Sequence, residues 1–480
     1  MTSLDDLIRS CLLPAVSGSG LTPWLRRQLE TGMPGVLVLP GAVPAGRTDA
    51  AVLAGTVHGH AEDLLVAVDE EGGDVTLLDH AEGSAYPGSL ALGVADDLEL
   101  TARVATAMAE DLAAAGITYN LAPSLDVNSD PDNPIIGVRS FGSDPALVAA
   151  HGSAYIRAMQ NGGIAVAAKH FPGHGATVSD SHHSLPVVPI DADTFRAREL
   201  APFAAAVAAG AKSLMAGHVL FPAVDPDAPA SMSRTILHHL LRTEWHYDGV
   251  VVGPAVAMAS AHGPDAVADA AVRSLRAGAD LLLLGGADPQ PLCDIIVAAV
   301  HEAVRGGVLD ADDLARAAGR VAALRSWTGA ARRSRGVGQE AAARAARSTG
   351  DVVLPGPAVV VELREDAHSQ VGGAHWSIAE PLAALGLTAA RITVGPSGDG
   401  PEEVLATTGS TPLVLAVRDA YRHPWQRTWL DRALALRPDA VLVAVGMPDD
   451  AALTDTASIT THGAGRVNTR AAADLLAGRP

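Results

Sequence analysis

Residues 164–186 read IAVAAKHFPGHGATVSDSHHSLP, and this stretch decides how the rest of the chain is interpreted. Its first five residues are apolar, which is typical of a buried parallel strand. Pro172, Gly173 and Gly175 then favour an open loop. The loop carries one lysine, four histidines and one aspartate, a density of titratable groups that packing does not require. A solvated polar loop is the simpler alternative to a strand that ends in a reactive loop.

Two parts of this loop are candidates for chemistry. Asp180 and His182 are two residues apart, and a carboxylate so close to an imidazole orients the ring and favours its protonated form. The pair is therefore a candidate general acid/base, with a structural pair as the alternative. Lys169 and His170 stand at the strand end, where they would be held rigidly and could donate hydrogen bonds to a ligand.

Around this stretch, residues 1–327 alternate short apolar runs with amphipathic windows of helical period. The apolar runs are 35–40, 64–69, 117–123, 164–169, 213–218, 249–252 and 279–284. This alternation predicts a parallel α/β domain. Seven or eight such units fit a (β/α)8 barrel of the TIM type, and an open doubly wound sheet is the alternative.

Polar residues follow several of these runs, where a barrel carries its reactive groups. They are Asp69, Asp126, Asn128, Lys169, His170 and His218. Since the carboxyl ends of parallel strands meet at one face of a barrel, we expect Asp69, Lys169 and His170 to converge there on one pocket, together with Arg139 from the loop at 128–143.

A second domain is expected after a change in composition. Residues 328–350 are rich in alanine and arginine and predict a linker with one helical piece. Residues 351–480 resume the α/β pattern, with apolar runs at 359–363, 413–417 and 440–446. About 130 residues suffice for a separate hydrophobic core, so a smaller C-terminal α/β domain is predicted.

Composition excludes several classes of function. The formal net charge is −20, which disfavours a nucleic-acid partner. No apolar stretch reaches the length of a membrane span, and no signal peptide is visible, so a cytoplasmic protein is expected. Cys11 and Cys293 are far apart and have no metal-ligand spacing. A cysteine-based zinc site and a disulfide scaffold are therefore disfavoured. We predict no metal site and no cofactor.

The reactive stretch also resembles a known family. The run from Lys169 to Gly175, followed by Asp180-Ser-His182, is similar to the signature of glycoside hydrolase family 3 in its N-acetyl-β-glucosaminidase (β-N-acetylhexosaminidase) branch. Asp69-Glu-Glu-Gly-Gly and residues 125–141 resemble two further family stretches.

The resemblance implies a role for each matching residue. His182 would be the acid/base and Asp180 its partner. The sugar contacts would be Asp69, Arg139, Lys169 and His170, with His218 in another matching stretch. The implied ligand is a small carbohydrate, an amino-sugar glycoside.

One position departs from the family. Its nucleophile is an aspartate just past the strand expected at 249–252, and this chain has Pro254 there, in a frame that Gly249 and Met258 keep. Proline cannot attack an anomeric carbon. Asp248 precedes the strand, so it is expected roughly 10 Å or more away, at the opposite face of the barrel.

The missing nucleophile leaves three interpretations. The first is a family 3-like hydrolase in which the 2-acetamido oxygen of the substrate replaces the nucleophile. Asp74 or Glu70 would then be candidates to orient the acetamide. The second is a sugar-binding or regulatory protein with the same fold. The third is an acid/base lyase, which needs a histidine but no nucleophile.

Overall fold

The computed structural model describes residues 3–18, 20–177, 185–253, 263–286, 288–327, 337–364 and 376–479. Contacts divide the chain into two compact units, each described separately below. The first unit comprises Met1–Glu70, Thr101–Ile136 and Gly142–Ser334. The second comprises Glu71–Leu100, Gly137–Phe141 and Arg335–Pro480.

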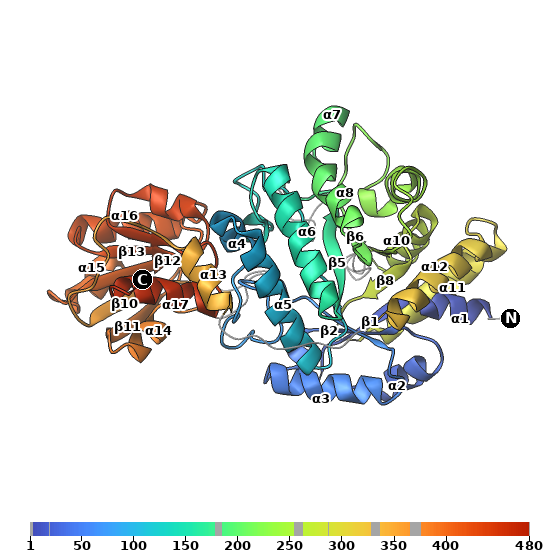
Figure 1. Cartoon of the computed structure of the whole chain (residues 1–480), viewed down its shortest axis with the longest axis horizontal. Coiled ribbons are helices and arrows are strands. Elements are labelled where there is room, and N and C mark those ends of the chain that lie inside the picture. Colours follow the sequence, from blue (N-terminus) through green and yellow to red (C-terminus); the bar gives the residue numbers. More distant parts are fainter. Residues whose placement is uncertain are drawn as a thin grey trace. The chain divides into compact units, whose positions relative to one another are not determined.

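The first unit is built on a closed barrel of eight parallel strands (Figure 1). The strands are β1 (Leu12–Val16), β2 (Gly35–Val38), β3 (Leu65–Val68), β4 (Tyr119–Asn120), β5 (Ala165–Phe171), β6 (Ser213–Ala216), β7 (Val250–Gly253) and β8 (Leu281–Leu284). Pairing of Leu12–Pro14 with β8 closes the barrel. The predicted TIM-type barrel is thereby confirmed, and the open sheet is excluded.

Helices connect the barrel strands and lie outside them (Figure 1). In chain order they are α1 (Leu4–Ser10), α2 (Pro23–Glu30), η1 (Pro40–Ala42), α3 (Arg47–His58), α5 (Leu98–Ala114), α6 (Pro145–Asn161), α7 (Ala192–Thr194), η3 (Phe195–Glu199), α8 (Leu200–Ala208), η4 (Ala230–Met232), η5 (Thr235–Glu244), α10 (Pro264–Ala277), α11 (Gln290–Arg305) and α12 (Ala311–Ser326).

Alternate residues of the strands form one buried cluster. It includes Leu13 and Ala15 of β1, Leu65 and Ala67 of β3, Ala165 and Ala167 of β5, and Leu281 and Leu283 of β8. Side chains of a strand point alternately to its two faces, so these residues share one face of the barrel wall. β1 was absent from the predicted runs; it contains Pro14, which has no amide hydrogen to donate to a neighbouring strand.

The second unit contains a six-stranded sheet in the order β11-β10-β12-β13-β14-β9, in which only the β14–β9 pair is antiparallel. The strands are β9 (Arg347–Thr349), β10 (Ala358–Leu363), β11 (Thr388–Val394), β12 (Leu413–Val417), β13 (Val441–Ala444) and β14 (Ser458–Thr460). The helices are α4 (Ser89–Ala95), η2 (Gly137–Arg139), α13 (Val337–Ala345), α14 (Ala379–Ala384), α15 (Pro401–Ala406), α16 (Pro424–Leu436), η6 (Pro448–Leu453) and α17 (Arg466–Leu476).

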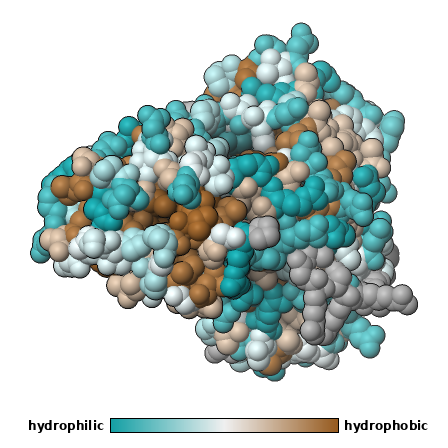
Figure 2. Space-filling view, turned by 60° about the vertical axis from the view of Figure 1, so that its left-hand side comes forward, coloured by the Kyte–Doolittle hydropathy of each residue, from teal (hydrophilic) through white to brown (hydrophobic). Residues whose placement is uncertain are grey.

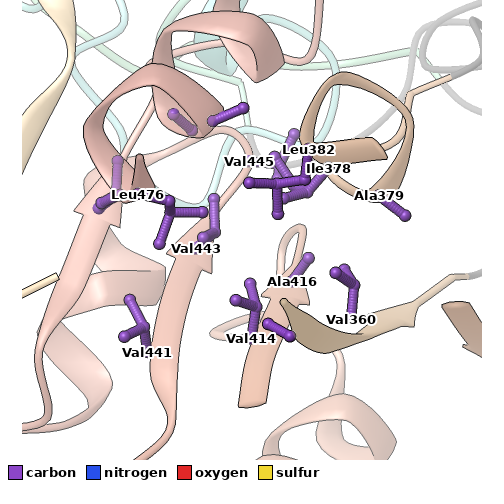
Figure 3. Close-up of a cluster of buried hydrophobic side chains, with 14 of the residues drawn as sticks. Val360, Ile378, Ala379, Leu382, Val414, Ala416, Val441, Val443, Val445 and Leu476 are labelled. Atoms are coloured by element: carbon purple, nitrogen blue, oxygen red, sulfur yellow. The ribbon is translucent and has the colours of Figure 1, made fainter. Parts of the chain in front are cut away.

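One face of this sheet has a dense apolar core. Figure 3 shows side chains of β10, β12 and β13, among them Val360, Val414 and Val443, facing Leu382 of α14 and Leu476 of α17. The second α/β domain predicted from the sequence therefore has its own core. Within the range expected to be a linker, the described residues include α13 and β9, and β9 pairs with β14 at the edge of the sheet.

The segment that follows β3, Glu71–Leu100, belongs to the second unit. Gly73 approaches Gly88 and Gly465 so closely that a Cβ at Gly465 would lie 3.1 Å from the Cα of Gly73. Asp74 forms an ion pair with Arg418, which follows β12, and accepts the amide hydrogen of Ala464 at 2.9 Å. A chain segment that leaves a barrel strand is thus folded into a unit that is otherwise mostly C-terminal.

Hydrophilic residues are widespread on the face seen in Figure 2, and apolar residues gather left of its centre. Among the described residues, no helix combines the length and apolar character that a bilayer span requires.

Candidate active site

The carboxyl ends of β3 and β5 bring two predicted sugar contacts together. Lys169 Nζ lies 2.6 Å from Asp69 Oδ1. The lysine side chain is almost fully buried, with 3% of its surface exposed, whereas that of Asp69 is 41% exposed. The pair therefore has its ammonium held inside the barrel and its carboxylate at the surface, where hydroxyl groups can reach it.

A second pair forms beside it around Asp126. The carboxylate of Asp126 is fully buried and lies 2.7 Å from His170 Nδ1. It also accepts the amide hydrogen of His174 at 2.7 Å and the hydroxyl of Ser124 at 2.9 Å. Burial by itself would raise the pKa of Asp126, but the charge and the hydrogen bond of His170 outweigh it and lower that pKa to about 2. Asp126 is thus a permanent carboxylate that fixes the orientation of His170.

The glycines of the motif permit this packing. A Cβ at Gly175 would lie 1.9 Å from the carbonyl oxygen of Val127, closer than any real contact. Gly173 has φ of +142°, a conformation that side chains rarely adopt. The loop after β5 can therefore lie directly on the segment after β4.

His218 follows β6, as predicted, and is half-buried. Its Nδ1 lies 2.8 Å from the hydroxyl of Ser231. Burial, aided by the charge of Arg273, lowers its pKa. His218 is therefore a neutral imidazole at ordinary pH, suited to hydrogen bonding rather than to charge pairing.

Arg139 belongs to the second unit, where it forms a two-point ion pair with Glu71. The distances are 2.9 Å from Nε to Oε2 and 2.7 Å from Nη2 to Oε1, and both residues are buried. The structure therefore brings Asp69 to Lys169 and Asp126 to His170. The convergence of Arg139 with them stays a prediction.

Three predicted positions, Asp180, His182 and Pro254, lie outside the described residues. Asp248 directly precedes β7 and is paired with Arg320 at 2.8 Å. It stands at the amino end of its strand, as expected, and so at the opposite end from Lys169.

Sequence reasoning gave no role to Asp126 or Glu71. Asp126 was noted only as a polar residue after a predicted strand. That position was the one sequence feature that pointed to a role in the site. Asp74, a candidate to orient an acetamide, has both carboxylate oxygens engaged with Arg418 and Ala464. Among the described residues, no group of three or more His, Cys, Asp or Glu side chains is arranged to hold a metal ion.

The protein contains a closed parallel barrel with an ion pair at the carboxyl ends of two strands. It therefore belongs to the (β/α)8-barrel class, in which the functional site lies at that end of the barrel. Residues 51–324 match the sequence family described as the glycosyl hydrolase family 3 N-terminal domain. The chain belongs to this family, and the resemblance noted in its motifs is confirmed.

Individual relatives agree with this assignment. Beta-hexosaminidase A of Pseudoalteromonas piscicida is 37% identical over 237 residues, which are 46% of this chain and 40% of that protein. A beta-hexosaminidase of Stenotrophomonas maltophilia (strain K279a) is 34% identical over 57% of this chain and 82% of its own length. The solved glycoside hydrolase family 3 beta-N-acetylglucosaminidase from Paenibacillus sp. str. FPU-7 is 29% identical, with a TM-score of 0.88 over 99% of this chain and 97% of that one.

Proposed function

We propose that this protein is a glycoside hydrolase that acts on N-acetyl-β-glucosaminides. The observation that carries the proposal is the contact between Asp69 and Lys169 at the carboxyl end of the barrel, in a chain of glycosyl hydrolase family 3. The names of its relatives, beta-hexosaminidase and beta-N-acetylglucosaminidase, support the choice of substrate.

The Asp69–Lys169 pair and the Asp126–His170 pair have different roles in sugar recognition. The exposed carboxylate of Asp69 accepts hydrogen bonds from sugar hydroxyls, while Lys169 pairs with it and donates to a further oxygen. His170, oriented by Asp126, presents Nε2 to the ligand. In this proposal Arg139 also contacts the sugar, and His218 contributes a neutral hydrogen-bonding group.

The chemical step uses His182 as the group that protonates the leaving oxygen, with Asp180 as its partner. Since Pro254 replaces the usual carboxylate, the proposal assigns stabilisation of the oxocarbenium-like transition state to the 2-acetamido oxygen of the substrate. Of the two candidates to orient the acetamide, Asp74 has both oxygens engaged with Arg418 and Ala464, and Glu70 directly follows Asp69 in the chain. A non-catalytic sugar-binding protein is the second candidate, and Pro254 is the observation that favours it.

A pair of aryl substrates tests these assignments. We expect hydrolysis of the chromogenic N-acetyl-β-glucosaminide and little or no hydrolysis of the matching β-glucoside. Asp69→Asn should lower kcat/KM by about tenfold or more, since a hydrogen bond to a charged group contributes about 1.5–3 kcal/mol. Asp63→Asn is the matched control, because Asp63 precedes the same strand and forms its ion pair with Arg325, at 2.6 Å.

The outcomes separate the candidates. Equal turnover of both substrates would rule out participation of the acetamido group. No turnover of either, together with saturable binding of N-acetylglucosamine that Asp69→Asn weakens, would favour the binding protein. Equal effects of Asp69→Asn and Asp63→Asn would show that the site is placed wrongly.

A further inference from the structure

A buried carboxyl group lies behind the loop that carries the family motif. Glu199 ends η3, and only 1% of its surface is exposed. Gly173 packs directly against it: a Cβ at Gly173 would lie 2.3 Å from Glu199 Oε2 and 3.2 Å from Glu199 Cβ. The absence of a side chain at Gly173 is therefore what makes room for the Glu199 carboxyl.

The two oxygens of this carboxyl differ. Oε1 accepts a hydrogen bond from Arg198 Nε at 2.7 Å, whereas Oε2 has no hydrogen-bond partner among the described residues. Burial raises the pKa of Glu199 to about 7, because the opposing effect of Arg198 is smaller and the charge of Asp126 adds to the rise. Glu199 is consequently uncharged in mildly acidic solution.

The charged groups that act on Glu199 come from two elements. Arg198 is on η3 itself, and Asp126 comes from the segment after β4. Asp126 in turn faces His170 and His174 of the motif loop. The site thus contains two nearby carboxyl groups with opposite tendencies, since Asp126 stays ionised while Glu199 keeps its proton.

We propose that Glu199 is a positioning residue for sugar binding: its buried carboxyl packs against Gly173 and so holds the loop and the Asp126–His170 pair in the arrangement that receives the ligand. The inference rests on the proposed function, because His170 contacts a sugar only in that proposal. Ionisation of Glu199 places a second negative charge near Asp126 and leaves a buried anionic oxygen against Gly173. The loop and the His170 ring then lose the arrangement that receives the ligand.

Binding of N-acetylglucosamine at pH 6 and pH 8, measured by calorimetry, tests the inference. With a pKa of about 7, roughly one molecule in eleven keeps Glu199 uncharged at pH 8, so the wild-type Kd should rise by about tenfold. In Glu199→Gln, which keeps the shape and cannot ionise, the Kd should change by less than about twofold. Glu302→Gln, at an exposed residue of α11, should behave as the wild type.

A measurement without ligand keeps this inference separate from the proposed function. The backbone amide resonance of Gly173, which packs against Glu199 Oε2, should show an inflection near pH 7 in the wild type that Glu199→Gln removes. The same inflection in both proteins would overturn the inference. If neither protein binds N-acetylglucosamine, the proposed function fails, and the resonance titration still decides the role of Glu199.

Discussion

The buried ion pair between Asp74 and Arg418 allows a quantitative test of how the second unit is held together. The side chain of Asp74 is 1% exposed and that of Arg418 is 15% exposed. Arg418→Met removes the guanidinium and leaves a buried carboxylate that still accepts the amide hydrogen of Ala464 at 2.9 Å. Breaking a buried pair on one side costs about 3–5 kcal/mol.

For a unit of this size, about 1 kcal/mol changes Tm by roughly 2–4 °C. We therefore expect Arg418→Met to lower the Tm of the second unit by about 6–20 °C, measured by calorimetry on the full chain. Arg432→Met is the matched control: Arg432 pairs with Glu402 on the surface, where both side chains are more than half exposed. Such a pair contributes only about 0–1 kcal/mol.

The double variant Asp74→Asn/Arg418→Met completes the test. The amide at position 74 can still accept the hydrogen bond of Ala464 but carries no charge, so most of the lost stability should return. A Tm of Arg418→Met equal to that of Arg432→Met, or a double variant less stable than Arg418→Met, would refute the reasoning.

Three further predictions concern individual residues. The pKa of Asp126 is lowered from 3.8 to about 2, so its stabilisation, about 2 kcal/mol, is present above pH 4 and is lost as the pH falls through 2. The Tm difference between wild type and Asp126→Asn should therefore narrow as the pH is lowered from 5 toward 3, and a constant difference would contradict this. Gly173→Ala should destabilise the protein by about 1–3 kcal/mol in urea unfolding, since its Cβ would lie 2.3 Å from Glu199 Oε2. Gly55→Ala, with open space around it in α3, should be neutral or slightly stabilising. Leu382→Ala in the core of Figure 3 should cost about 2–5 kcal/mol, and the half-exposed Leu436→Ala about 1 kcal/mol or less; equal losses would place the core elsewhere.

Much of the fold could be predicted because buried parallel strands are continuous apolar runs in the sequence. Seven barrel strands and three strands of the second sheet coincide closely with such runs. Four strands were missed: β1, β9, β11 and β14. β11 is mostly exposed at the edge of its sheet, and β9 is a short exposed strand, so their residues need not be apolar.

The candidate site, like the fold, was partly predictable from the sequence. Asp69, Lys169 and His170 could be named because the carboxyl ends of barrel strands meet at one face, whatever the helices between them do. Their proximity follows from the order of the strands, which the sequence shows as apolar runs that alternate with windows of helical period.

The pairings themselves depend on tertiary structure. Asp126 with His170, Arg139 with Glu71, and Asp74 with Arg418 join residues 44, 68 and 344 positions apart. In the sequence Glu199 resembles an exposed glutamate on a helix, and only the structure shows that it is buried against Gly173. The sequence by itself determined which residue types stand at strand ends, because local periodicity specifies strands. The folded chain alone decided their partners, their burial and hence their charges, because these depend on which distant segments come into contact.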